Sequence, residues 1–215
     1  VHTSRPIVLL PLLAALLNGC GSLPDPMGWF ESDNQAPPAE LTDYEPRVQV
    51  KTLWVQDSGG GSEKQYLKLV PAVYQGRVVV ADAEGRVQSL NSENGQNVWK
   101  QDTEAPISGG PGVGEGLVLV GTRDAEVIAL NENDGEELWR SRLSSEVLSV
   151  PRVQDETVVV HTIDGKLYGL DAENGAQQWT YDRTVPVLTL RGNSSPVIDG
   201  ASVIAGFASG KLVNL

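Results

Sequence analysis

The chain has 215 residues, with 16 Lys or Arg against 28 Asp or Glu, which gives a formal net charge of −12. A hydrophobic fraction of 40% is enough for a packed core and excludes a fully disordered chain. The acidic balance argues against nucleic acid as a partner, because phosphate binding needs clustered Lys and Arg. One Cys and two His exclude a disulfide framework and a Cys-rich metal site. We expect no metal and no cofactor.

The first segment has the pattern of an export signal. An apolar run over residues 7–17 is shorter than the roughly 20 residues of a membrane-spanning helix, but it suits the core of a signal peptide. It leads into Leu17-Asn18-Gly19-Cys20, which resembles a bacterial lipobox. We therefore predict a signal peptide over residues 1–19 and a lipid on Cys20. The alternative is a buried helix that ends in a buried Cys.

Residues 20–46 are predicted to consist of the lipidated Cys20 and a disordered tether after it. The part after Cys20 contains five Pro and six acidic residues, with no Lys or Arg. Such a composition cannot bury enough apolar surface to order itself. The tether is expected to hold a folded body away from a membrane surface.

An internal repeat determines the predicted fold. Residues 77–99, 117–139 and 157–179 align without gaps, and a fourth copy runs from Pro196 to the last residue, Leu215. Each of the first three copies contains a short Val-rich run, a turn, an alternating run, a Gly-containing turn and a Trp, and the fourth ends before its Trp. Turns of the Asn-Gly and Asp-Gly type favour hairpins because these residues accept positive φ. Four strands in about 40 residues are typical of a propeller blade.

The sequence thus predicts an all-β fold, a β-propeller of four-stranded blades that occupies residues 47–215. Three blades and part of a fourth are present, so we expect the chain to be the first part of a longer protein. Four Trp are expected to pack between blades rather than to hold a ligand: Trp54, Trp99, Trp139 and Trp179.

Two of the junctions between repeats carry five extra residues. At the two middle junctions the spacing is 12 residues, from Trp99 to Pro111 and from Trp139 to Pro151. It is 17 residues from Trp54 to Pro71 and again from Trp179 to Pro196. An insertion between blades projects from one face of the ring, so the second insertion is a candidate site for a partner.

The repeat motif LNxxxGxxxW, which follows a Val-rich strand, resembles the repeats of pyrroloquinoline-quinone dehydrogenases and their relatives, which are eight-bladed propellers. With the lipobox, the tether and the run from Leu188 to Pro196, the chain resembles the BamB family. These are the propeller lipoproteins of the outer-membrane β-barrel assembly (BAM) machinery. The resemblance covers nearly all 215 residues, as about the first half of a family member.

The resemblance implies a non-catalytic scaffold on the periplasmic face of the outer membrane. It implies binding to the POTRA domains of BamA, indirect contact with the other BAM lipoproteins, and help in the assembly of unfolded outer-membrane proteins. The family's contact loop matches Leu188, Leu190 and Arg191 here. An alternative for the two leucines is a place in the core of the fourth blade.

Two other functions stay open from the sequence. One is an enzyme similar to the quinone-dependent dehydrogenases, although the chain lacks their vicinal Cys pair because its single Cys lies in the lipobox. The other is a periplasmic propeller that binds peptides or carbohydrates. His161 follows a Val-rich strand with no recognisable nucleophile beside it, which favours a packed or rim histidine over a catalytic base.

Overall fold

The computed structural model describes residues 38–45, 47–183, 185–186, 188 and 190–215, and the chain divides into two units, residues 1–49 and 50–215. The described residues of the first unit are exposed and contain no helix or strand. The predicted signal peptide (1–19), Cys20 and most of the predicted tether lie outside the described residues. No helix in the described ranges is long and apolar enough to cross a bilayer.

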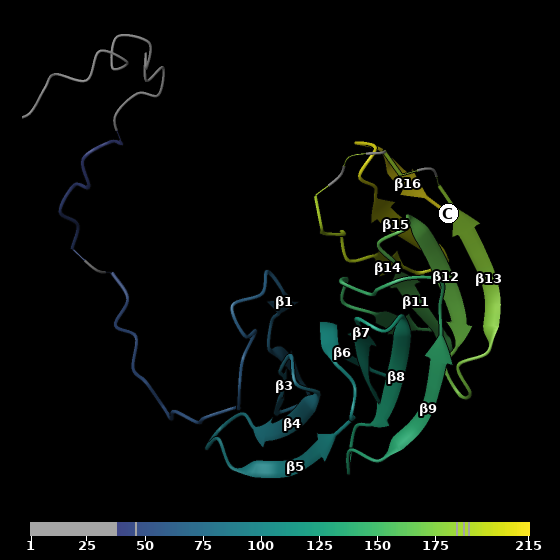
Figure 1. Cartoon of the computed structure of the whole chain (residues 1–215). Helices are drawn as coiled ribbons and strands as arrows, with labels where there is room; N and C mark the ends of the chain where they lie inside the picture. Colours follow the sequence, from purple (N-terminus) through teal and green to yellow (C-terminus); the bar gives the residue numbers. More distant parts are fainter. Residues whose placement is uncertain (1–37, 46, 184, 187, 189) are drawn as a thin grey trace, which may run out of the picture. The chain divides into compact units, whose positions relative to one another are not determined.

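Every regular element of the second unit is a strand, and the strands form four sheets, one for each repeat (Figure 1). Blade 1 consists of β2 (Ala72–Tyr74), β3 (Arg77–Ala81), β4 (Arg86–Asn91) and β5 (Asn97–Asp102). Blade 2 consists of β6 (Ile107–Gly114), β7 (Leu117–Thr122), β8 (Glu126–Asn131) and β9 (Glu137–Arg142), with β1 (Lys68–Leu69) added beside β6. Blade 3 consists of β10 (Arg152–Gln154), β11 (Thr157–His161), β12 (Lys166–Asp171) and β13 (Gln177–Asp182). Blade 4 has three described strands, β14 (Val197–Asp199), β15 (Ser202–Gly206) and β16 (Leu212–Asn214).

The register of the strands repeats from blade to blade. The central antiparallel pairs place Val78 opposite Leu90, Val118 opposite Leu130 and Val158 opposite Leu170. In each of these three blades the third strand also pairs with the outer strand, and that pairing shifts its register between the Leu and the residue before it. The predicted propeller of four-stranded blades is confirmed for the three complete repeats.

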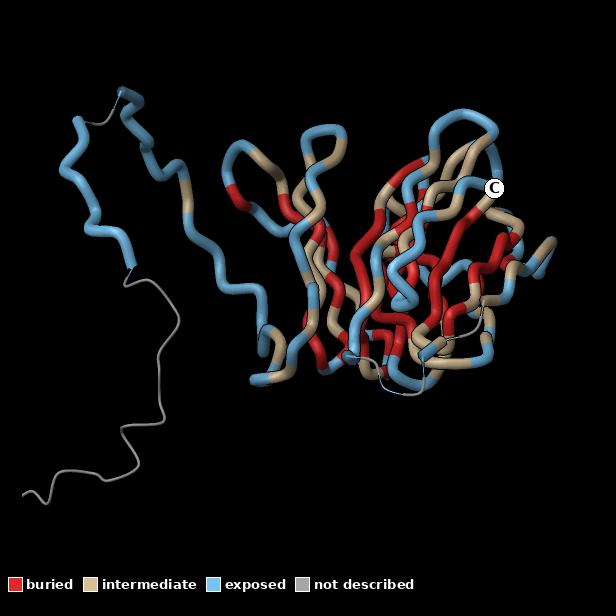
Figure 2. The backbone as a smooth tube through the Cα atoms, turned by 90° about the horizontal axis from the view of Figure 1, so that it is seen from above, coloured by how far each residue is buried: buried red, intermediate tan, exposed pale blue. Residues whose placement is uncertain are grey.

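Apolar residues fill the spaces between neighbouring blades, which explains the Val-rich runs. Along β7, Leu117 and Leu119 join a core cluster shared with blade 3, whereas Val118 and Val120 join a cluster shared with blade 1. Because successive side chains of a strand point to opposite faces, a sheet covered on both faces needs a continuous apolar run. Figure 2 shows the buried residues along the strands, with exposed residues at many of the turns. Each fully buried Val or Leu contributes about 1.5–3 kcal/mol relative to exposure.

The inner strand of blade 2 departs from the predicted pattern. The short strand β1 pairs with it in parallel, with Lys68 opposite Gly109, and this sheet therefore has five strands.

Close packing explains the glycines of β6. A Cβ on Gly109 would lie 2.4 Å from the carbonyl oxygen of Ser149, and one on Gly112 would lie 2.0 Å from that of Pro151. The inner strand therefore approaches the segment before blade 3 at backbone contact distance.

Candidate functional site

Trp54, Trp99 and Trp139 each contact the blade that follows them in the chain. The indole N–H donates to a backbone carbonyl in the turn before the outer strand of that blade. The three bonds are Trp54 Nε1 to Ser92 O (2.9 Å), Trp99 Nε1 to Glu132 O (2.8 Å) and Trp139 Nε1 to Ala172 O (2.8 Å). The polar N–H of each indole therefore has a hydrogen-bond acceptor where the ring is buried.

The glycine of the same turn lies under the indole ring. A Cβ on Gly135, which has a φ of +79°, would lie 2.5 Å from the ring of Trp99. Gly95 and Gly175 stand in the same relation to Trp54 and Trp139. The sequence explains these glycines by positive φ, and the structure adds close contact with the ring as a second reason. Trp179 is half-buried and lies against Gly169 of its own blade.

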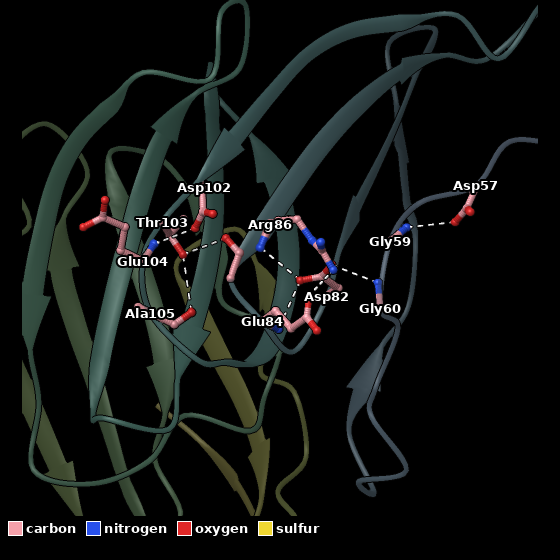
Figure 3. Close-up of polar contacts among 11 residues, drawn as sticks. Asp57, Gly59, Gly60, Asp82, Glu84, Arg86, Asp102, Thr103, Glu104 and Ala105 are labelled. Atoms are coloured by element: carbon pink, nitrogen blue, oxygen red, sulfur yellow. Dashed lines mark hydrogen bonds and ion pairs between the residues drawn. The ribbon is translucent and has the colours of Figure 1, made fainter.

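The junction with the first insertion, between Trp54 and Pro71, is fixed to blade 1 by a buried carboxylate (Figure 3). Asp82 is 1% exposed, and its Oδ2 accepts from Gly60 N at 3.2 Å and from Arg86 Nε at 2.6 Å. The second oxygen of Asp82 accepts the backbone N–H groups of Glu84 and Arg86. Burial alone raises the pKa of Asp82, but the bonds from Arg86 and Gly60 outweigh it and hold the pKa below its usual value. Asp82 is therefore a charged anchor for this insertion.

The second insertion lies in the 183–196 junction, between β13 and β14. Leu188 is 92% exposed and Leu190 is 90% exposed, and the first strand of blade 4 begins only at Val197. The alternative that the two leucines belong to the core of blade 4 is therefore wrong. Exposed leucines close together on one junction are the kind of apolar surface that a protein partner can cover.

Arg191 lies in the same junction and forms a two-point ion pair with Glu146. Its Nε is 3.2 Å from Glu146 Oε2, and its Nη2 contacts Oε1. Glu146 belongs to the 143–151 junction, between β9 and β10, and its backbone carbonyl accepts the N–H of Ile163 at 3.0 Å. The guanidinium is thus held by a carboxylate whose own backbone is fixed on blade 3.

Hydrogen bonds also fix the residues on both sides of the exposed leucines. The bonds are Arg183 N to Gly165 O (3.2 Å), Asn193 Nδ2 to His161 O (3.3 Å), His161 Nδ1 to Ser194 O (3.2 Å) and Val150 N to Ser195 Oγ (3.0 Å). The described residues at the two ends of the 183–196 junction are therefore tied to blade 3 and to the 143–151 junction.

His161 is the central residue of these contacts and is 2% exposed. Its ring packs against Phe207 of blade 4, with centroids 4.9 Å apart. Burial lowers the pKa of His161, and the Ser194 carbonyl and the charge of Asp164 oppose this shift only in part. The neutral imidazole thus links blades 3 and 4 beneath the 183–196 junction. The described residues include no group of three or more His, Cys, Asp or Glu arranged to hold a metal.

Comparison with known proteins gives the relationship of the chain. The model of a family described as outer membrane protein assembly factor BamB matches residues 47–106 and 83–215. The chain belongs to the BamB family. It is 56% identical over 201 residues to BamB of Pseudomonas aeruginosa, an alignment that covers 94% of this chain and 51% of that relative. It is 59% identical over 204 residues to BamB of Alkalilimnicola ehrlichii, with 95% and 49% covered.

Solved structures agree with this family. The crystal structure of BamB from Moraxella catarrhalis matches with a TM-score of 0.65 at 28% identity, over 70% of this chain and 46% of that one. The computationally designed protein Ika4 matches with a TM-score of 0.60 at 17% identity, over 72% and 94% of the two chains, which concerns the fold alone. The chain spans about half the length of the curated BamB relatives that it matches.

Reasoning from the BamB resemblance selects Leu188, Leu190 and Arg191 but misses Glu146. A packed His161 is expected from the sequence, and the structure adds its contacts with the 183–196 junction. A signal for Glu146 is present in the sequence. Glu146 stands five residues before Pro151, and Arg191 stands five residues before Pro196. Opposite charges at the same repeat position of neighbouring junctions predict an ion pair, because equivalent positions of adjacent blades lie side by side.

Proposed function

We propose that this chain belongs to a non-catalytic scaffold lipoprotein of the BAM complex. In this role it binds the POTRA domains of BamA, meets the other BAM lipoproteins through BamA, and assists the insertion of unfolded outer-membrane proteins. Membership of the BamB family supports the assembly role. The observation that carries the partner site is the pair of exposed leucines, Leu188 and Leu190, on a junction fixed at both described ends.

The chemistry of the 183–196 junction suits a protein partner. Leu188 and Leu190 are exposed over 92% and 90% of their surface, so a partner that covers them removes apolar surface from water. The hydrogen bonds at both ends reduce the ordering that binding requires, which favours affinity. Arg191 stands beside the two leucines in the sequence, and Arg is enriched at protein interfaces.

The proposal includes the location of the protein. A signal peptide over residues 1–19, a lipid on Cys20 and a tether to residue 46 place the propeller on the periplasmic face of the outer membrane. Several acyl chains on one Cys anchor a protein stably, since each buried CH₂ contributes about 0.8 kcal/mol. Mass spectrometry of membrane-extracted protein tests this part, because the lipid adds its mass to a peptide that begins at Cys20. A chain that keeps residues 1–19 contradicts it.

Titration of the purified chain with BamA POTRA domains tests the partner site. We expect the double variant Leu188→Ala/Leu190→Ala to weaken binding by about tenfold or more, as central apolar contacts of an interface do. Thermal unfolding should be unchanged, because both side chains are exposed.

The control is Leu138→Ala, which removes a half-exposed leucine from the outer strand β9 and should leave binding intact. Equal affinity of the double variant and the unchanged chain would exclude these leucines from the partner surface. No binding by the unchanged chain, in a preparation that circular dichroism shows to be folded β-structure, would contradict the proposed function itself.

A further inference from the structure

We infer that Arg191 is a positioning residue, which Glu146 holds in place so that Leu188 and Leu190 are presented to the partner. This inference rests on the proposed function, and it assigns Glu146 a part in partner binding. It also changes the role of Arg191 from a direct contact to a clamp between two neighbouring junctions.

The geometry of the ion pair carries the first step. Both Nε and Nη2 of Arg191 face the two oxygens of Glu146. A two-point pair of this kind fixes the orientation of the guanidinium as well as its distance. Glu146 therefore occupies the side of the guanidinium that is formed by Nε and Nη2.

The fixed place of Glu146 carries the second step. Its side chain is 14% exposed against 40% for Arg191, and its backbone carbonyl accepts the N–H of Ile163 in the turn between β11 and β12. Arg191 is thus attached to a rigid support. An ion pair between two free surface chains contributes little, whereas a pair with one fixed partner can hold the position of a loop.

The place of Arg191 along the chain carries the third step. It lies between the exposed Leu190 and the residues Asn193 to Ser195, which are bonded to His161 and Val150. The clamp therefore acts between Leu190 and the residues that these bonds hold at 193–195. Breaking it removes a support next to Leu190 and leaves the bonds at 193–195 in place.

A charge-exchange cycle tests this inference. Glu146→Arg and Arg191→Glu each place two like charges together, and the double variant restores an opposite pair in reversed order. We expect each single variant to weaken POTRA binding by about tenfold to a hundredfold, the range that charged hydrogen bonds support. The double variant should recover most of this loss. Hydrogen exchange of the amides at 190–192 should rise in the single variants and return in the double.

The control is Arg123→Glu, which reverses an exposed Arg in the turn between β7 and β8 that contacts the 103–106 segment through its backbone. It should change neither measurement. Recovery of slow exchange without recovery of binding would mean that Arg191 touches the partner itself, which overturns the inference. Unchanged exchange in the single variants would overturn it as well. Failure of the unchanged chain to bind would instead reject the proposed function, because the exchange cycle decides the clamp without any partner.

Discussion

At the scale of single residues, the glycine before each Trp strand combines two requirements. Gly135 adopts a φ of +79° and also leaves room for the ring of Trp99. A residue with a Cβ fails on both counts, since positive φ strains L side chains and the Cβ would lie 2.5 Å from the ring. The Asn-Gly and Asp-Gly turns therefore contribute to the contact between blades as well as to the hairpins.

His161 gives a prediction for the dependence of stability on pH. Burial lowers its pKa below the ordinary value of 6.5, so the unfolded chain takes up a proton at a pH where the folded chain does not. The stability that the neutral ring contributes is complete above about pH 6.5 and is lost as the pH falls below it. We expect the urea midpoint of the chain to fall between pH 7.5 and pH 5.

The matched variant is His161→Gln, which keeps a side-chain N–H donor for the Ser194 carbonyl but has no proton to gain in this range. Its urea midpoint should vary less between pH 7.5 and pH 5 than that of the unchanged chain. Carboxylates with lowered pKa values, such as Asp82 and Asp164, act below this window. Parallel pH curves for the two proteins would show that His161 does not titrate on unfolding.

At the scale of elements, the junctions between blades carry the variation of the molecule while the strands repeat. The turn between β3 and β4 accepts the first insertion through Asp82, at a repeat position that Thr122 occupies in blade 2. The hydroxyl of Thr122 accepts the backbone N–H of Glu126. Asp82 therefore gives the first insertion an acceptor in a place where blade 2 has a hydroxyl that is used within its own turn.

Asp82→Asn tests this anchor with almost no change of shape. The amide nitrogen accepts from neither Gly60 nor Arg86, so bonds to a charged group are lost, each of them worth about 1.5–3 kcal/mol. We expect hydrogen exchange at residues 58–62 to quicken by about tenfold or more, with one tenfold for each 1.4 kcal/mol. The control Thr122→Val should leave exchange at 58–62 unchanged. Equal exchange in Asp82→Asn and the unchanged chain would contradict the role of Asp82.

At the scale of the whole molecule, blades 1 and 2 and blades 2 and 3 are joined by separate Trp–Gly contacts, so the energies of these two contacts should add. Gly135→Ala and Gly175→Ala each combine backbone strain of roughly 1–2 kcal/mol with about 1–3 kcal/mol of overpacking. We expect each to lower the free energy of unfolding by about 2–5 kcal/mol, and the double variant to equal the sum within about 0.5 kcal/mol. Urea unfolding followed by Trp fluorescence measures all three.

Gly116→Ala separates strain from contact in this series. Gly116 has a φ of +80°, but a Cβ there would meet nothing within 4 Å, so only the backbone strain applies. A loss as large as that of Gly135→Ala would mean that the Trp ring contributes nothing. A double variant far from the sum would mean that the two contacts are coupled through the blade between them.

The sequence predicts the blades well and the site only in part, for a physical reason. Strands that repeat bury equivalent residues, so Val118 and Leu130 have counterparts that identify them. The parallel pairing of β1 with β6 has no counterpart in the other described sheets, so the repeat pattern of the sequence does not predict it. The exposure of Leu188 and Leu190 depends on where β14 begins, and the role of Glu146 depends on a contact across two junctions.

The direction of the Trp contacts has a consequence for how the protein is made. Trp54, Trp99 and Trp139 each precede their glycine partner in the chain, so each ring is covered only when the blade that comes next has formed. A chain that emerges with its N-terminus first therefore holds one indole exposed at a time. Each newly formed turn covers the indole that precedes it in the chain, so the blades pack together in the order of their synthesis.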